Sequence, residues 1–445
     1  MRKRLLALAL AATMALGTVA CTGGGDTPSV YFLNFKPEVA EVYNQIVAAY
    51  KEEKNIDVKV VTAASGTYEQ TLTSEIAKSE PPTIFQINGP VGYANWKDYV
   101  ADVSDSELYK HMIDKSQAIT DGGKTYGIPY VVEGFGIIYN EAIMKKYFGL
   151  ANKAVSISAT TEIKDFATLK QVAEDMTKHK AELGIKGVFS NTSLKPGEDW
   201  RWQTHLADVP FYYEFTEDKI DLNKGTPAQV TFKYGPQYQS LFDLYLNNST
   251  TEKGQLGSKT VDEAMAEFAL GQSAMVQNGN WGWGQIAIVQ GNTVKAEDVH
   301  FLPLYTGVTG EDKQGICIGT ENYFAINNDI SDASKKASLD FLYWLFSSET
   351  GKKYVTEQLR FITPFDTFTA KEVPNDPLAT EVRTWMDNKE VKNLPWVFTV
   401  FPSQQFKDDF GGALLQYAQG KTDWAKVSST VVDSWKTQAA AAEGS

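Results

Sequence analysis

The sequence predicts an α/β fold. Three segments within the first 90 residues have the apolar character of buried strands, at 30–33, 56–60 and 83–87. Two segments with the apolar spacing of helices separate them, at 39–50 and 68–78. The order strand, helix, strand, helix, strand favours parallel strands joined by crossover helices, and therefore an α/β sheet.

Local patterns support each of these elements. The first helix is indicated by apolar residues every three or four positions, namely Val39, Val42, Tyr43, Ile46, Val47 and Tyr50. Pro37 suits a first helical turn, and Pro81 and Pro82 end the second helix. Sheets of this class bind ligands beyond the carboxyl ends of their strands. The loops at 34–36 and 88–90 are therefore expected to contact a ligand.

The rest of the chain repeats this mixture of elements. A helix is expected at 165–180 and a short strand at 187–190. Thr260 and Glu263 have the spacing of a capping box before a helix that runs to Leu270. Further helices are expected at 332–345 and through most of the tail from residue 402 onward.

The N-terminus has the pattern of an export signal. Basic residues at 2–4 precede an apolar run at 5–15, which is too short to span a bilayer. We expect a signal peptide over 1–20, followed by Cys21 in a position that resembles the lipidation site of bacterial lipoproteins. Residues 21–27 would then form a flexible tether. An ordinary signal peptide that happens to contain a cysteine is the alternative.

Composition excludes several classes of function. The 445 residues include 55 acids against 42 bases, a net charge of −13, which argues against nucleic-acid binding. The four histidines show no metal-ligand spacing, so neither a metal site nor a cofactor is expected. Cys317 lies in an apolar stretch without a cationic partner and is expected to be inert.

One glycine-rich segment superficially resembles a phosphate-binding loop. It runs from Gly254 to Thr260, but Ser258 precedes Lys259, and no clear strand comes before the segment. We interpret it as a turn followed by a helix N-cap.

Two clusters set tryptophans among glycine, amide and acidic residues, at 199–205 and 278–284. Aromatic rings stack on the apolar face of a pyranose ring, while amide and carboxylate groups bind its hydroxyls. Packing in a hydrophobic core is the alternative for each single tryptophan. Two such clusters together favour a carbohydrate cleft.

A longer pattern resembles a known family. The segment 121–130, Asp-Gly-Gly-Lys-Thr-Tyr-Gly-Ile-Pro-Tyr, is followed by Glu133 and by Ile138-Tyr139-Asn140. With the segments 268–281 and 323–327, this is similar to the extracellular solute-binding proteins of ABC sugar importers, which include maltose, raffinose and multiple-sugar binders.

The resemblance implies a type II periplasmic-binding-protein fold, with two hinge-linked lobes around a central ligand cleft. By that pattern the N-terminal lobe holds residues 28–135 and 322–362. The C-terminal lobe holds residues 136–321 and 363–445.

The same resemblance implies the ligand-binding residues. They are Asn34, Lys36, Asn88, Glu133, Asp199, Trp200, Trp202, His205, Asn278, Trp281, Trp283, Glu321, Asn322 and Phe406. Trp281 matches the stacking tryptophan of the family. A purely structural role in the hinge is the alternative for Glu133.

We therefore expect a binding protein that captures a neutral oligosaccharide, because the candidate walls are mostly amide with few charges. A peptide or polyamine binder is an alternative. A secreted glycoside hydrolase that uses Glu133 and Asp199 as its carboxylate pair is a more distant one.

The resemblance also implies partners and a location. The expected partners are an oligosaccharide, the permease subunits of an ABC transporter, and a membrane reached through the lipid on Cys21. The protein is expected to be a monomer without nucleic acid, held on the extracellular face of the bacterial cell membrane.

Overall fold

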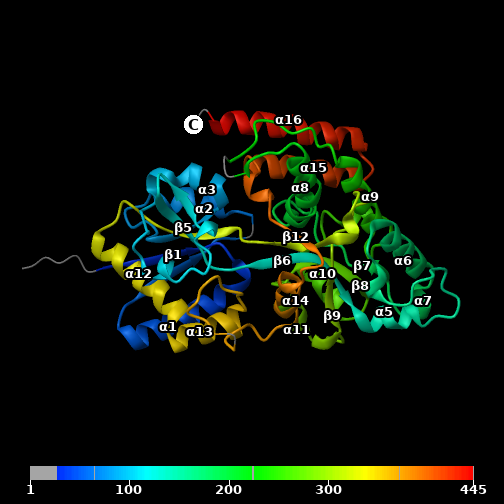
Figure 1. Cartoon of the computed structure of the whole chain (residues 1–445), viewed down its shortest axis with the longest axis horizontal. Helices are drawn as coiled ribbons and strands as arrows, with labels where there is room; N and C mark the ends of the chain where they lie inside the picture. The colour runs from blue at the N-terminus through cyan, green and yellow to red at the C-terminus, as the bar shows by residue number, and fades with distance from the viewer. Residues whose placement is uncertain (1–27, 65, 223–224, 370, 444–445) are drawn as a thin grey trace, which may run out of the picture.

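The computed structural model of the chain describes residues 28–64, 66–222, 225–369 and 371–443. The predicted signal peptide, Cys21 and the tether lie outside the described residues. The described part contains two six-stranded sheets, each packed with helices (Figure 1). The two sheets with their helices are called the first and the second lobe below.

The first sheet has the order β2-β1-β3-β11-β5-β4. Its strands are β1 (Val30–Asn34), β2 (Val58–Thr62), β3 (Ile84–Asn88), β4 (Ile119–Asp121), β5 (Lys124–Pro129) and β11 (Asn322–Ile326). As predicted, β1, β2 and β3 are parallel neighbours, and Phe32 is paired with both Val60 and Ile84. β11 is antiparallel to β3 and to β5, between which it lies.

The second sheet has the order β12-β10-β6-β8-β7, with β9 paired to β6. Its strands are β6 (Glu133–Asn140), β7 (Gly187–Phe189), β8 (Ser273–Gly279), β9 (Val299–Leu302), β10 (Gln314–Gly319) and β12 (Lys392–Leu394). All eight residues of β6 are buried, because helices pack on both faces of this sheet.

Helices enclose both sheets, with α1, α12 and α13 on one side of the first sheet and α2 and α3 on the other (Figure 1). Those of the first lobe are α1 (Ala40–Lys54), α2 (Tyr68–Ile76), α3 (Gly89–Trp96), α4 (Glu107–Lys110), α12 (Asp332–Ser347) and α13 (Glu349–Lys353). Those of the second lobe are α5 (Glu141–Phe148), α6 (Phe166–Lys178), α7 (Lys180–Leu183), α8 (Ala207–Glu217), α9 (Gly235–Asn247), α10 (Val261–Ala269), α11 (Gly282–Ala287), α14 (Pro377–Asp387), α15 (Gln404–Ala418) and α16 (Trp424–Glu443).

The two-residue period of the strands creates a hydrophobic core on each face of a sheet. In β1, Phe32 packs into the core that contains α1 and α12, while Leu33 faces the core beneath α2. In β6, Ile137 and Ile138 divide in the same way between the two cores of the second lobe.

Helix ends agree with the predicted signals, with one difference. The capping box before α10 is present, since the Thr260 hydroxyl accepts from the Glu263 N–H at 3.2 Å and the Glu263 carboxylate accepts from the Thr260 N–H at 2.7 Å. The helix predicted at 165–180 is two helices, α6 and α7. His179, with a φ of −95° and a ψ of 10°, separates them, and Gly184 ends α7 with a positive φ of 78°.

Three chain segments pass from one lobe to the other. They are residues 130–132 between β5 and β6, residues 320–321 between β10 and β11, and the segment from Arg360 to Asp376 before α14. The Val132 N–H donates to the Ile362 carbonyl at 2.7 Å, so the first and third crossings are bonded to each other. The lobe bounds at 135, 321 and 362 stay a prediction.

Candidate functional site

A cavity of about 610 Å³ lies between the two lobes. The two loops that the sequence places beyond the carboxyl ends of strands both border it, at Phe35 and Lys36 after β1 and at Asn88 at the end of β3. Most of the lining from the second lobe comes from residues 197–201 and 203–205, Trp281, Trp396, Phe398, Thr399, Phe401, Ser403, Gln404 and Lys407. Small-molecule sites typically measure roughly 300–1,000 Å³, so the cavity has the size of a ligand site.

The structure divides the predicted site residues into two groups. Eight of them line the cavity: Lys36, Asn88, Glu133, Asp199, Trp200, His205, Trp281 and Glu321. The other predicted residues, Asn34, Trp202, Asn278, Trp283, Asn322 and Phe406, do not line it. Ligand contact by any of these residues stays a prediction.

Asn34 shapes the loop that carries Lys36. The Asn34 side-chain oxygen accepts from the Lys36 N–H at 3.0 Å, and its amide donates to the Lys36 carbonyl at 2.8 Å. A second bond, from the same amide to the Thr62 hydroxyl at 3.1 Å, ties the loop to β2. Asn34 is fully buried, so it acts by holding Lys36 toward the cavity.

Lys36 and Glu133 form a buried ion pair across the lobes. The Lys36 Nζ lies 2.8 and 2.9 Å from the two carboxylate oxygens of Glu133, and both residues are nearly inaccessible to solvent. Burial alone would lower the pKa of Lys36. The attraction of Glu133, with smaller contributions from Glu38 and Glu321, outweighs burial and raises that pKa to about 12. The lysine is therefore charged at neutral pH.

Asn88 and Glu321 connect β3 to the second crossing. The Asn88 side-chain amide donates to the Glu321 carboxylate at 2.9 Å, and the Gly89 N–H donates to the Glu321 carbonyl at 3.1 Å. Asn322 is the next residue, but its side chain is buried in β11, paired in register with Asn88, and neither of its amide atoms has a hydrogen-bond partner within the described residues.

A π-helical turn at Arg201–Leu206 presents the first aromatic cluster. Trp200 before the turn and His205 within it line the cavity, whereas Trp202 points into the core of the second lobe. The Trp202 indole N–H donates to the Ser193 carbonyl at 2.9 Å, which satisfies its polar atom there. Two tryptophans of the same cluster therefore have different environments, since Trp200 lines the cavity and Trp202 belongs to the core.

His205 lies at the centre of an aromatic cluster on the cavity wall. Its ring stacks on Phe135 with centroids 4.2 Å apart and planes at 6°, and Trp200, Trp281 and Phe398 surround it at 4.8 to 5.4 Å. Burial lowers the pKa of His205 well below its usual value, and the charges of nearby basic residues lower it further. The ring is therefore neutral at pH 7.

Trp281 follows β8 and lies over its last residue, Gly279. A Cβ atom at Gly279 would be 2.2 Å from the indole ring, so only glycine leaves room for the ring in this position. The Lys36 Nζ lies 5.9 Å from the ring centroid. Trp283, two residues later, packs instead against the core between α10 and α14.

Asn278 lies behind the cavity wall. Its side-chain oxygen accepts from the Arg201 Nε at 2.9 Å, and its amide contacts the Met265 sulfur at 3.2 Å. Arg201 does line the cavity, although the sequence prediction did not include it.

Asp199 and Phe406 differ in their access to the cavity. Asp199 lines it, but its carboxylate packs so closely on α15 that a Cβ at Gly411 would be 1.9 Å from Oδ2. Burial raises the pKa of Asp199 to about 6, and the charge of Asp408 adds to this rise. Phe406 is fully buried against Trp435, with ring centroids 5.0 Å apart.

The expectation of walls with few charges is wrong. Seven acidic residues line the cavity, namely Glu38, Glu69, Glu133, Glu198, Asp199, Asp262 and Glu321, together with the bases Lys36, Arg201 and Lys407. Sequence patterns did not reveal Glu69 and Lys407, because they reach the cavity from the faces of α2 and α15.

Trp396 and Phe398 complete the aromatic wall. They come from a weak aromatic cluster in the sequence, 396–398, whose only signal was two rings separated by one residue. Both side chains are buried, and their rings are 5.2 Å apart.

The lobes contact each other through glycines at two places, and Gly66, Gly197 and Thr399 of these contacts also line the cavity. A Cβ at Gly66 would lie 2.8 Å from the Cα of Gly197, so two backbones meet there. A Cβ at Gly89 would lie 2.9 Å from the Cβ of Thr399. These contacts enclose the cavity between the lobes.

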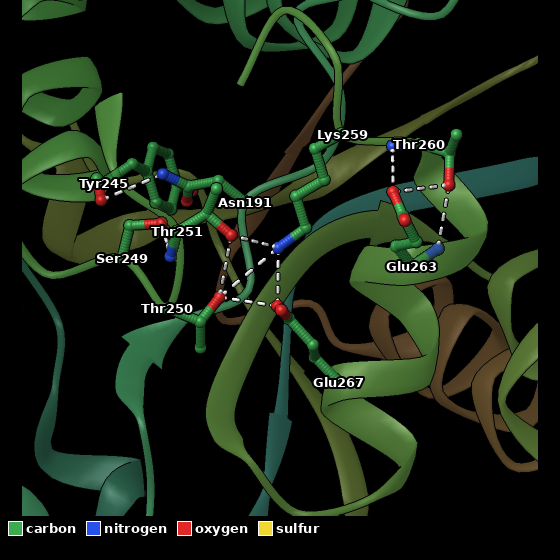
Figure 2. Close-up of polar contacts among 9 residues, drawn as sticks. All are labelled: Asn191, Tyr245, Ser249, Thr250, Thr251, Lys259, Thr260, Glu263 and Glu267. Atoms are coloured by element: carbon green, nitrogen blue, oxygen red, sulfur yellow. Dashed lines mark hydrogen bonds and ion pairs between the residues drawn. The ribbon is translucent and has the colours of Figure 1, made fainter. Parts of the chain in front are cut away.

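Lys259 is bound inside the protein, as Figure 2 shows. Its Nζ donates to the Glu267 carboxylate at 2.5 Å and to the Thr251 hydroxyl at 2.6 Å, and its side chain is 6% exposed. The segment 254–260 is thus a turn and an N-cap, as expected, and its lysine is already paired.

The described residues contain no group of three or more His, Cys, Asp and Glu side chains arranged to hold a metal ion. Cys317 is buried, and burial raises its thiol pKa. Within the same part of the chain, no helix combines the length and apolar character needed to cross a bilayer.

Comparison with known proteins gives the fold and the family. The chain is 26% identical over 312 residues to an uncharacterised ABC transporter extracellular-binding protein of Pyrococcus horikoshii, a match that covers 64% of this chain and 65% of that protein. It is 22% identical to the maltodextrin-binding protein of Bacillus subtilis, over 63% of each chain. The chain thus spans less than two thirds of the length of these curated relatives.

Among solved structures, a chitin oligosaccharide binding protein superposes with a TM-score of 0.71 at 17% identity, covering 94% of this chain and all of the other. That likeness confirms the predicted two-lobed type II fold. The family model of bacterial extracellular solute-binding proteins matches residues 45–381. The chain therefore belongs to the family of bacterial extracellular solute-binding proteins.

Proposed function

We propose that the protein captures an oligosaccharide outside the cell and delivers it to the permease of an ABC importer. The observation that carries this proposal is the composition of the cavity between the lobes. Trp200, Trp281, Trp396 and Phe398 offer apolar ring faces from the second lobe. Side chains of the first lobe, such as Lys36 and Asn88, offer donors and acceptors for hydroxyl groups.

The structural relation between the lobes supports capture by enclosure. A ligand in the cavity would contact both lobes, so it would gain its full binding free energy only when the lobes are closed around it. The names of two similar proteins, a maltodextrin-binding protein and a chitin oligosaccharide binding protein, support a carbohydrate of several units.

Titration calorimetry against a panel of oligosaccharides tests the proposal. We expect at least one oligosaccharide of two to five sugar units to bind, and expect monosaccharides to bind more weakly because they cannot contact both lobes. The same panel includes short peptides and polyamines. Binding of one of these classes, with no response to any saccharide, would contradict the proposal.

A binding role without catalysis is also supported by the carboxylates. In a glycoside hydrolase a general acid must carry a proton to the leaving group. Both oxygens of Glu133 already accept from Lys36, and the Asp199 carboxylate is packed on Gly411. We expect no reducing ends to be released from any oligosaccharide that binds; their release would contradict this point.

Lipid anchoring at Cys21 and a monomeric state belong to the same proposal. We expect Cys21→Ser to release the protein from the membrane fraction into the medium, and mass spectrometry of the anchored form to find a lipid on the N-terminal cysteine. Light scattering of the released form is expected to give the mass of one chain. Retention of the Cys21→Ser protein at the membrane would contradict the lipid anchor.

A further inference from the structure

Arg201 is a buried cation of the cavity wall that lacks an acidic partner. The residue is 3% exposed. Its Nε donates to Asn278 at 2.9 Å, and its guanidinium carbon lies 3.8 Å from the centroid of the Trp200 ring. Within the described residues its two Nη groups make no hydrogen bond, and no carboxylate lies within 4.0 Å. Such a charge is unfavourable to bury unless something pairs with it.

The other buried charges of the wall do not compensate Arg201. Lys36 and Glu133 neutralise each other through two short hydrogen bonds. Asp199 is held against α15, where its carboxylate packs on Gly411. Burial lowers the pKa of Arg201 to about 9, although the more distant charges of Glu38, Glu198 and Asp262 partly oppose this fall.

Most of the remaining acids lie toward solvent or have partners. Glu38 and Asp262 are exposed, so water screens their charges. Glu198 is paired with Lys195 at 3.0 Å, and Glu69 accepts from the Trp96 indole at 3.0 Å. Of the seven lining acids only Glu38 and Asp262 are exposed, and the partly buried Glu69, Glu198 and Glu321 each have a hydrogen-bond partner.

The basic residues act together on the aromatic wall. After burial, the charges that lower the pKa of His205 are those of Arg201, Lys36 and Lys407, which are all the lysine and arginine residues of the lining. Because Glu133 already pairs with Lys36, Arg201 is the buried cation of this wall that a negative ligand group would neutralise.

We infer that the cavity binds an acidic oligosaccharide, in which an oxyanion such as the carboxylate of a uronic acid accepts from the two Nη groups of Arg201. A planar guanidinium pairs with a carboxylate through two parallel hydrogen bonds. Asn278 is a positioning residue, because its bond to Nε fixes the direction of the other donors. This inference rests on the proposed function and narrows its ligand class.

Matched saccharides separate the effect of the ligand's negative charge on affinity from the effect of its sugar units. The probes are trisaccharides of galacturonate and glucuronate, each as the free acid and as its neutral methyl ester, with a sulfated disaccharide as a second oxyanion. We expect at least one acid to bind about tenfold or more tightly than its ester in calorimetry at low salt. If the sulfated disaccharide binds and the uronates do not, and if this binding also depends on Arg201, the result would support an oxyanion site and identify its ligand group as sulfate.

Variants locate the effect at Arg201. Arg201→Gln is expected to reduce the affinity ratio of acid to ester to near one, and Arg201→Lys to retain part of it. Lys195→Gln is the matched control, since it removes a cation six residues earlier that does not line the cavity. Thermal unfolding reports whether each variant is folded. If Arg201→Gln does not fold, the affinity ratio of acid to ester is measured in Arg201→Lys instead.

Two results would overturn the inference alone. One is equal affinity for acid and ester, or binding of neutral saccharides only, which would leave the proposed function standing. The other is an acid preference that persists in Arg201→Gln. If no saccharide of any kind binds, the proposed function fails and this inference fails with it.

Discussion

The buried carboxylate of Asp208 accepts a hydrogen bond from the backbone N–H of Val397 at 2.6 Å. The same oxygen accepts from the Phe398 N–H at 3.1 Å. Through these bonds α8 holds the segment that presents Trp396 and Phe398 to the cavity. Burial raises the pKa of Asp208 to about 8, although the two bonds partly oppose this rise.

Asp208 is expected to make stability depend on pH. The unfolded chain releases this proton near pH 4 and the folded protein only near pH 8. The free energy of unfolding is therefore expected to fall as the pH rises from 4 to 8. The slope is at most about 1.4 kcal/mol per pH unit, and it ends above pH 8. Urea unfolding of Asp208→Asn at pH 5 to 9 should lack this component. Asp433→Asn, on the exposed face of α16, should keep it; equal slopes in wild type and Asp208→Asn would contradict the assignment.

Trp281 and Trp283 form a matched pair for testing the aromatic wall. Trp281→Ala should weaken ligand binding about 10- to 100-fold, because a ring that faces the cavity is removed. Trp283→Ala should leave affinity within about twofold, since this ring packs against a core. Calorimetry gives both affinities, and the reverse order of effects would show that the cavity has been misassigned.

Removing one charge of the Lys36–Glu133 pair should lower the free energy of unfolding strongly. Lys36→Met leaves a buried carboxylate without its cation, which is expected to lower the free energy of unfolding by about 3–5 kcal/mol at pH 7. The double variant Lys36→Met/Glu133→Gln should recover a large part of that loss. Chemical denaturation measures all three proteins. A double variant no more stable than the single one would show that the loss comes from packing.

Gly66 tests the contact between lobes. Gly66→Ala places a methyl group 2.8 Å from the Gly197 Cα, so the lobes must separate at this point. We expect weaker ligand affinity and a larger radius of gyration with ligand in X-ray scattering. Gly123→Ala is the control, because its φ of 79° matches the 71° of Gly66 while its methyl group would meet nothing within 4 Å. Equal behaviour of the two variants would mean that backbone strain, and no contact between lobes, is responsible.

The sequence predicted the elements whose causes are local. The strands at β1, β2 and β3 and the cap at Thr260 follow from apolar alternation and from one pair of side chains three residues apart. The place where β11 joins the first sheet, between β3 and β5, depends on contacts across some 200 residues, which no local pattern contains.

The residues that line the cavity differ from the predicted set where side-chain orientation decides. Trp200 and Trp202 are two residues apart in one cluster, and the π-helical turn directs only the first to the cavity. Asn278 was expected to contact the ligand, but Arg201, for which no role was predicted, lines the cavity and the Asn278 amide oxygen accepts from it. The direction in which each side chain points settles both cases, and residue type alone does not give that direction.

The bond between the crossings at Val132 and Ile362 restricts the freedom of any hinge. Two connections joined by a backbone hydrogen bond move as one ribbon, so rotation of one lobe against the other would have few independent coordinates. We expect such a restricted motion to cross one dominant barrier. Closure on a ligand should therefore give a single exponential phase in stopped-flow tryptophan fluorescence, with a rate that reaches a plateau at high ligand concentration.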